Sequence, residues 1–269
     1  MNNVLIVGCG HMGSALLESW NKKTNYNFSV IEPKHYSSLK KKYSKKINFF
    51  KSFEEIKNIK KYDIIVFAIK PQIAEKVIRQ FKINLKRNIL LISIIAGKKI
   101  SFFSKILGSQ HQIIRVMPNM PASVGKGITC LVYKKEISRQ HKKISSFLFK
   151  KVGEIIWLNK ESEIDKITAI SGSGPAYFYF FIECMFQASK ELNLSDNVSK
   201  KLVYNTAFGS IKLLENSTKS AKKLKENIAV KGGTTEAAIN IFEKDKLFKN
   251  IVKKAVFAAY RRSLFLGKK

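Results

Sequence analysis

Three glycines near the start of the chain have the spacing of a nucleotide-binding loop. An apolar run at residues 4–7 leads into Gly8-Cys9-Gly10-His11-Met12-Gly13, and residues 14–20 follow with helical character. In a dinucleotide site the first glycine permits a tight turn, the second lets the pyrophosphate approach the backbone, and the third lets the helix pack on the strand. Ordinary strand-to-helix turns share this spacing, but the strand–loop–helix order favours a dinucleotide.

The second expected strand, at residues 28–31, ends next to a carboxylate that bears on the choice of dinucleotide. Glu32 lies 19 positions after Gly13, where an acidic residue commonly binds the ribose diol of NAD. A carboxylate repels the 2′-phosphate of NADP, yet Lys34, His35 and the lysines at 40–42 could accommodate that phosphate. The sequence therefore leaves NADH and NADPH open, and a solvated loop glutamate is a third interpretation.

Loops after other expected strands carry further candidates. Residues 68–71 (Ala-Ile-Lys-Pro) and 93–97 (Ser-Ile-Ile-Ala-Gly) fall at the carboxyl ends of strands, where ligands bind in open α/β sheets. Two prolines, Pro118 and Pro121, bracket Asn119 and fix the shape of its loop. Asn119 could hydrogen-bond a carboxamide or support the site indirectly, and a purely structural turn is the alternative for each of these loops.

Two glycine-rich segments interrupt the second half of the chain. Residues 171–175 (Ser-Gly-Ser-Gly-Pro) disfavour continuous helix, and Pro175 suits the first turn of a restarted one, leaving N–H groups and hydroxyls beside a small-residue surface. In Gly232-Gly233-Thr234-Thr235-Glu236, Gly233 can serve as an N-cap, and the helix start offers N–H donors suited to a carboxylate. A plain helix cap is the alternative.

The order of the apolar runs predicts the fold class. Eight short runs alternate with helical segments up to residue 158, which indicates βαβ units in a Rossmann-type doubly wound sheet. Helical periodicity dominates thereafter. We expect an α/β fold with a dinucleotide-binding domain at residues 1–160 and an all-helical substrate and dimerisation domain at residues 161–269. The strands are expected at residues 4–7, 28–31, 47–49, 64–69, 89–92, 113–116, 128–132 and 155–158. The later helices are expected at residues 161–170, 175–192, 196–215, 221–229, 234–244 and 247–266.

Composition narrows the function classes. The chain has 269 residues and a net charge of +31, but the basic excess is almost entirely lysine spread along the chain. Since specific phosphate and base readers favour arginine, nucleic-acid binding is not expected as the main role. No secretory or membrane-spanning pattern stands out, so we expect a cytoplasmic protein without a membrane partner. Three scattered cysteines and four scattered histidines predict neither disulfides nor a metal site.

Taken together, these loops resemble pyrroline-5-carboxylate reductases over nearly the whole chain. The glycine loop is shared by many dehydrogenases, whereas the Ser-Gly-Ser-Gly-Pro-Ala stretch at 171–176 and the Gly-Gly-Thr-Thr stretch at 232–235 are specific to this family. Lys231 departs from the family pattern, which often has proline before the paired glycines. The resemblance implies reduction of the cyclic imine of 1-pyrroline-5-carboxylate to L-proline, the last step of proline biosynthesis, with NADPH or NADH as cofactor.

The resemblance also implies roles for individual residues. Gly233 and Thr234 would bind the substrate carboxylate through backbone N–H groups, the Thr235 hydroxyl would hydrogen-bond the imine nitrogen as the catalytic group, and Ser173 would lie at the substrate. Family members form dimers through interlocked helical domains, with the substrate loop supplied by the neighbouring subunit, and often assemble into decamers. With the residue-based candidates Gly13, Glu32 and Asn119 included, the expected cofactor-binding set is Val7, Gly8, Cys9, Gly10, His11, Met12, Gly13, Glu32, Ala68, Ile69, Lys70, Pro71, Ala96, Pro118 and Asn119.

Two other functions compete with this one. A related dehydrogenase acting on a small hydroxy acid would need a catalytic lysine or histidine in the helical domain, and no such pattern is evident. The second competing function is that of a non-catalytic protein that binds NAD(P) or nucleic acid. The chain shows no Ser-His-Asp set and no paired catalytic carboxylates, which fits chemistry supplied by a nicotinamide cofactor.

Overall fold

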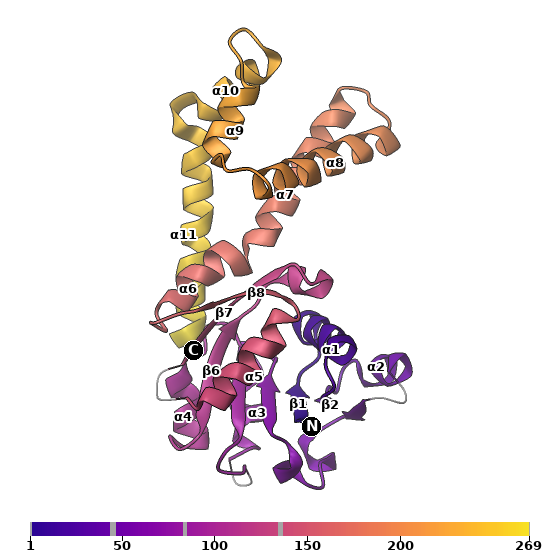
Figure 1. Cartoon of the computed structure of the whole chain (residues 1–269), viewed down its shortest axis with the longest axis vertical. Helices are drawn as coiled ribbons and strands as arrows, with labels where there is room; N and C mark the ends of the chain where they lie inside the picture. The colour runs from indigo at the N-terminus through magenta and orange to yellow at the C-terminus, as the bar shows by residue number, and fades with distance from the viewer. Residues whose placement is uncertain (1, 44–46, 83–84, 134–136, 269) are drawn as a thin grey trace. The chain divides into compact units, whose positions relative to one another are not determined.

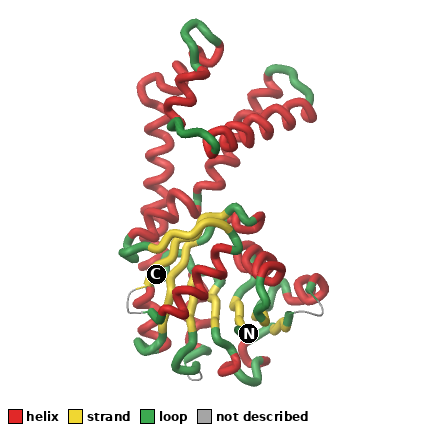
Figure 2. Tube along the Cα trace, in the orientation of Figure 1, coloured by secondary structure: helices red, strands yellow, loops and turns green. Residues whose placement is uncertain are grey.

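The computed structural model describes residues 2–43, 47–82, 85–133 and 137–268. The chain forms two compact units, the first made of residues 1–173 with 259–269 and the second of residues 174–258 (Figure 1). Every strand of the described residues belongs to the first unit, whereas the second contains helices and loops (Figure 2).

The first unit is built on an eight-stranded sheet, which confirms the predicted fold class. Its strand order is β3-β2-β1-β4-β5-β6-β7-β8. All neighbours are parallel except β6 and β7, which pair antiparallel, so this pair departs from the βαβ units that the sequence indicated. The connection at residues 118–126 is too short for the crossover that a parallel pair needs. The strands are β1 (Asn3–Val7), β2 (Asn27–Ile31), β3 (Asn48–Phe50), β4 (Ile64–Phe67), β5 (Leu90–Ser93), β6 (Gln112–Met117), β7 (Gly127–Tyr133) and β8 (Gly153–Trp157).

Apolar residues cover both faces of this sheet, as its non-alternating strands require. One core contains Trp20 and Phe149, whose rings meet edge to face at 5.4 Å, and the other contains Phe67 and Phe103. The Trp20 indole donates a hydrogen bond to the Leu148 carbonyl at 2.7 Å, which fastens the first helix to α5. The helices here are α1 (His11–Lys23), α2 (Tyr36–Lys42), α3 (Ala74–Arg79), α4 (Ile100–Leu107), α5 (Arg139–Lys150) and α6 (Glu163–Ile167).

A π-helical turn precedes the second unit and modifies one predicted helix. Instead of a continuous helix over 161–170, α6 ends at Ile167, a π turn spans Thr168–Gly172, and α7 begins at Gly174. Glycine and serine stabilise helix poorly, which explains why the regular hydrogen-bond pattern breaks there. The Ser173 N–H closes the wide turn on the Thr168 carbonyl at 2.8 Å. The interruption that the sequence predicted is therefore present, in the form of a widened turn.

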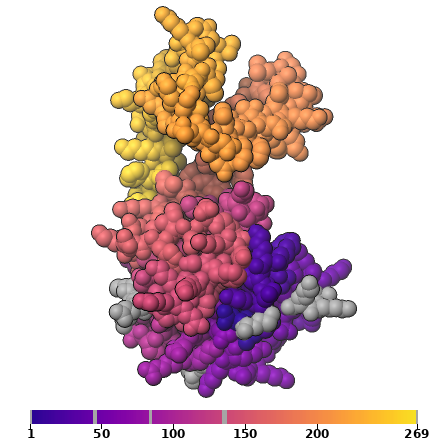
Figure 3. All heavy atoms as spheres, in the orientation of Figure 1, coloured from indigo at the N-terminus to yellow at the C-terminus, as the bar shows by residue number. Residues whose placement is uncertain are grey.

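The second unit consists of amphipathic helices with large exposed apolar side chains. Phe178, Phe180 and Phe208 are each more than 60% exposed. The helices of this unit are the orange to yellow spheres of Figure 3. No helix among the described residues combines the length and apolarity that a membrane crossing requires. The helices are α7 (Gly174–Glu191), α8 (Asp196–Glu215), α9 (Ala221–Ile228), α10 (Thr234–Glu243) and α11 (Leu247–Lys268), the last of which runs on into the first unit.

Candidate functional site

The glycine loop joins β1 to α1 in a turn that excludes side chains. Gly8 has a φ of +91°, a conformation that side chains rarely adopt, and its N–H donates to the Ile31 carbonyl at 2.8 Å. A Cβ atom built on Gly13 would lie only 2.5 Å from the Gly8 carbonyl oxygen. At Gly10, in contrast, a Cβ atom would meet nothing within 4 Å. The loop is thus close-packed on its inner side and open where a pyrophosphate would approach.

Helix α1 offers unsatisfied donors at this loop. It begins at His11 with Gly10 as N-cap, no side chain caps it, and its first turn contains no acidic residue. The first N–H groups of a helix lack partners within the helix, and the dipole there favours negative charge. Burial raises the pKa of the Cys9 thiol, and a hydrogen bond with Ser14 partly opposes this shift. Cys9 therefore stays a neutral packing residue.

A cleft of about 490 Å³ opens beside the glycine loop. Seven predicted cofactor residues line it, namely Val7, Gly8, Gly10, Glu32, Ala68, Ile69 and Lys70. Lys34 and His35 also line it, together with Lys51, Ser52 and Phe53, which the sequence analysis missed. The missed residues directly follow β3, so their place at the carboxyl end of a parallel strand was the available signal. Cys9, His11, Met12, Gly13 and Pro71 belong to the flanking backbone segments.

The Glu32 carboxylate holds the backbone on both sides of this cleft. Glu32 is 7% exposed, and its Oε2 accepts a hydrogen bond from the Cys9 N–H at 2.7 Å. Its Oε1 accepts from the N–H groups of Lys34 at 2.9 Å and His35 at 3.4 Å. The carboxylate therefore ties the glycine loop to the turn after β2. That is a structural role beyond the ribose contact predicted from the sequence.

The lysines at 40–42 do not line the cleft, and their contact with a 2′-phosphate stays a prediction. They belong to α2, where the Lys40 ammonium donates to the Tyr36 hydroxyl at 3.1 Å and Lys42 pairs with Glu18 at 3.0 Å. Helix α2 begins directly after the loop that holds Lys34 and His35. The Lys40 ammonium also lies over the Tyr36 ring, at 5.3 Å.

Asn119 connects the β6–β7 loop with the π turn. Its Oδ1 accepts from the Ile128 N–H at 2.9 Å, and its Nδ2 donates to the Ser171 hydroxyl at 3.4 Å. A Cβ atom on Gly172 would lie 2.4 Å from the end of the Met117 side chain, so the turn packs directly on the end of β6. Pro118 and Asn119 are buried, and Ala96 is half-buried. Contacts of these three residues with a cofactor remain predictions.

In the second unit, the Gly232–Thr235 segment starts α10. Gly233 is the N-cap, as the sequence predicted, and no side chain caps the helix. The Glu236 carboxylate instead accepts a hydrogen bond from the Gly232 N–H at 2.7 Å, which braces the loop. Gly232 has a φ of +76°, and Thr234 is exposed. Among the described residues, none gives the half-buried Thr235 hydroxyl a hydrogen-bond partner, so this helix start can receive a small anion.

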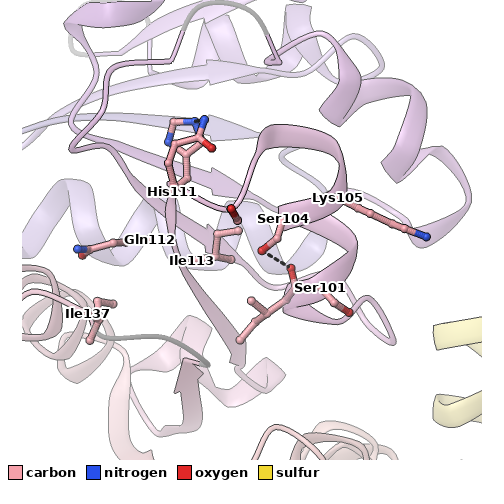
Figure 4. Close-up of a pocket in the computed structure, with 10 residues that line it drawn as sticks. Ser101, Ser104, Lys105, His111, Gln112, Ile113 and Ile137 are labelled. Atoms are coloured by element: carbon pink, nitrogen blue, oxygen red, sulfur yellow. Dashed lines mark hydrogen bonds between the residues drawn. The ribbon is translucent and has the colours of Figure 1, made fainter.

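Another cavity, of about 540 Å³, lies between α4 and β6 (Figure 4). It is lined by Ser101, Ser104, Lys105, His111 and Gln112, among others, and by no residue of the predicted sites. The described residues also contain no cluster of three or more His, Cys, Asp or Glu side chains that could hold a metal ion. The glycine-loop cleft and the α10 start are therefore the candidates for the chemistry.

Comparison with known proteins identifies the family. Residues 161–266 match the family model for pyrroline-5-carboxylate reductase dimerisation, and residues 3–97 match that for NADP oxidoreductase coenzyme F420-dependent. A pyrroline-5-carboxylate reductase of Haemophilus influenzae is 30% identical over 97% of this chain and 96% of its own length. The chain belongs to the pyrroline-5-carboxylate reductase family.

Other members of the family agree with this assignment. The pyrroline-5-carboxylate reductase of Pasteurella multocida is 35% identical over 75% of this chain and 73% of its own length. The crystal structure of the Plasmodium falciparum pyrroline carboxylate reductase, which has NADP bound, aligns with a TM-score of 0.88 at 35% identity, covering 99% of this chain and 98% of that one. The family favours the NAD(P)H-dependent reduction of pyrroline-5-carboxylate over the hydroxy-acid dehydrogenase and the non-catalytic protein.

Replacing Glu32 with glutamine tests its role in holding the glycine loop. The Glu32→Gln amide presents one N–H₂ group where the carboxylate accepted a backbone N–H, so at least one buried hydrogen bond is lost. We expect NADPH binding, followed by cofactor fluorescence, to weaken roughly tenfold, equivalent to ~1.4 kcal/mol. The matched control is Glu18→Gln, whose exposed carboxylate pairs only with lysines on α1 and α2. Equal affinities for wild type and Glu32→Gln would show that the loop does not depend on this carboxylate.

Proposed function

We propose that this member of the family reduces 1-pyrroline-5-carboxylate to L-proline with NAD(P)H, the last step of proline biosynthesis. The observation that carries the proposal is the pair of uncapped helix starts, α1 beside a cleft of about 490 Å³ and α10 beside Thr234 and Thr235, whose hydroxyls have no hydrogen-bond partner in the described part of the chain. The first suits a pyrophosphate and the second a small carboxylate. The functional division follows, with residues 1–160 holding the cofactor and residues 161–269 holding the substrate and forming the dimer.

The residues of the first unit fit a dinucleotide. The open backbone at Gly10, the donors of α1 and the apolar wall at Ile69 provide places for the pyrophosphate and a nucleoside. Ala96 and Pro118 would lie near the nicotinamide, and Val7 to Met12 with Ala68 to Pro71 would hold the remainder. When bound, the reduced nicotinamide supplies the hydride that adds to the imine carbon C5.

The α10 start would hold and orient the substrate. The N–H groups of Gly233 and Thr234 would bind its carboxylate, and the Thr235 hydroxyl would hydrogen-bond the imine nitrogen, with Ser173 nearby. The protonated imine is already electrophilic, so hydride addition at C5 turns the C=N π bond into the nitrogen lone pair without a strong general acid. The protein's contribution is then proximity and orientation, and the product is the secondary amine of proline.

NADPH is the proposed physiological cofactor. The two Glu32 oxygens already accept three backbone N–H groups, while Lys34, His35, Lys51 and Lys70 bring basic groups to the same cleft. Lys51 lines the cleft, and its ammonium lies over the Tyr36 ring at 5.3 Å. The NADP-bound Plasmodium falciparum structure supports the same choice.

A homodimer is the proposed assembly, and a decamer built from dimers is its further extension. The groove of about 470 Å³ between α7 and α8 is almost entirely apolar, with Phe178, Phe181 and Met185 among its lining residues. Contiguous exposed apolar surface marks an interaction site. The match to the dimerisation model spans these helices. A second copy of the chain would cover this surface and supply its α10 start to the neighbouring cofactor domain.

The central test is a spectrophotometric assay with 1-pyrroline-5-carboxylate and NADPH. Wild type should oxidise NADPH, and Thr235→Ala should turn over at least about tenfold more slowly because the imine nitrogen loses its hydrogen-bond partner, a barrier increase of ~1.4 kcal/mol. Thr235→Ser keeps the hydroxyl and serves as the matched control. No cofactor oxidation by wild type would refute the function, and wild-type turnover in Thr235→Ala would remove Thr235 from the mechanism.

Cofactor choice is tested by comparing kcat/KM for NADPH and NADH. We expect wild type to prefer NADPH, and Lys51→Ala to lower kcat/KM for NADPH by about tenfold because the 2′-phosphate loses a cation, worth ~1.4 kcal/mol. The value for NADH should stay nearly unchanged. Lys76→Ala on α3, outside the cleft, is the control. An equal loss with both cofactors would contradict a 2′-phosphate contact.

The assembly is tested by size-exclusion chromatography with light scattering. The smallest species should have about twice the 30.7 kDa chain mass. Phe181→Glu places a charge in the apolar groove and should shift this species toward the monomer, because an unpaired charge is costly to bury. Lys212→Glu, on the exposed surface of α8, is the control. A wild type that runs as a monomer at micromolar concentration would rule out the dimer.

A further inference from the structure

The loop between β5 and α4, at residues 94–99, is fastened at both ends. At its start the Ile95 N–H donates to the buried Ser93 hydroxyl at 3.2 Å. At its end the Ile100 N–H donates to the Glu161 carboxylate at 2.7 Å. Ala96, which the proposed function places near the nicotinamide, lies between these two points. The position of Ala96 therefore depends on the contacts made by the middle of the loop.

The middle of the loop is held by the end of α11 through a contact between two glycines. Gly97 has a φ of +76°, and a Cβ atom there would lie 2.7 Å from the Gly267 nitrogen and 2.8 Å from the Leu266 carbonyl carbon. A Cβ atom on Gly267 would lie 2.6 Å from the Gly97 carbonyl oxygen. Both obstacles are backbone atoms, so no flexible side chain can yield to an added methyl group.

A buried polar network fixes the end of α11 independently of this contact. The Ser263 hydroxyl donates to the Asp165 carboxylate at 2.8 Å, and both side chains are 3% exposed. The same Asp165 oxygen accepts from Arg115 at 3.2 Å, and Arg115 also pairs with Glu161 at 3.3 Å. Glu161 also accepts the hydrogen bond from the Ile100 N–H. One network therefore reaches both the end of α11 and the end of the loop at residues 94–99.

We infer that the end of α11, through Ser263 and Gly267, is a positioning element that sets the place of Ala96 for hydride transfer. This inference rests on the proposed function, because the proposed function places Ala96 near the nicotinamide. Neither Ser263 nor Gly267 needs to touch substrate or cofactor. A shift in this loop would move the nicotinamide relative to the imine carbon, and hydride transfer is sensitive to misplacement of about 1 Å.

The decisive variant is Gly267→Ala, compared with Gly209→Ala in α8. Both exchange a helical glycine for alanine, but a Cβ atom on Gly209 meets nothing within 4 Å. We expect Gly267→Ala to lower kcat about tenfold and to raise the primary isotope effect obtained with NADPH deuterated at both C4 hydrogens. Its Kd for NADPH should stay within twofold. Gly209→Ala should match wild type in all three measurements.

The isotope effect separates positioning from a merely structural role. A variant that only loses folded protein has a lower apparent kcat with an unchanged isotope effect, and this outcome would overturn the inference. So would wild-type kcat in Gly267→Ala. Ser263→Ala, with Ser263→Thr to restore the hydroxyl, should give the same pattern in milder form and be rescued by threonine.

Hydrogen–deuterium exchange of residues 94–100 reports on the loop without any assay of activity. Faster exchange there in Gly267→Ala than in Gly209→Ala is expected, and equal exchange would refute the inference. If wild type fails to reduce the imine while this exchange difference is present, the proposed function fails and the coupling of α11 to the loop stands.

Discussion

The contact between the backbones of Gly13 and Gly8 is the constraint on which the cofactor site depends. With no room for a side chain, α1 can start directly against the end of β1, so its unsatisfied N–H groups face the carboxyl edge of the sheet. The cleft forms at the same edge, because β1, β2 and β4 are parallel and end there together. The proposed dinucleotide site is thus a consequence of backbone packing before any side chain contributes.

The buried carboxylate of Glu32 connects two loops of the first unit through hydrogen bonds. A carboxylate removed from water is costly unless hydrogen bonds compensate, and here three backbone N–H groups do so. In return, two loops that are distant in sequence are held at a fixed separation. The rim of the same cleft remains basic through Lys34, Lys51 and Lys70, which makes the local charge favourable for phosphate despite the acid within it.

The buried network around Arg115 joins parts of the chain that are further apart in sequence than the loops that Glu32 connects. Arg115 is 2% exposed and would be destabilising alone, but Asp165 and Glu161 neutralise it and Ser263 completes the set. Such a network contributes little net stability compared with apolar packing, whereas its geometry specifies one arrangement of β6, α6 and α11. The π turn that follows α6 carries Ser171 to Asn119, so the network also bears on the loop between β6 and β7.

Local features of the fold follow from the sequence alone. The eight apolar runs, the glycine loop, the N-cap at Gly233 and a helix break near residues 171–175 all depend on neighbouring residues and follow from backbone preferences, although the π turn begins earlier, at Thr168. Tertiary structure alone decided which lysines face the cleft, the inward turn of Glu32, the antiparallel β7 and the packing of Gly267 on Gly97. These depend on contacts between segments far apart in the chain, and residue type and local spacing contain no information about which distant backbone will lie alongside.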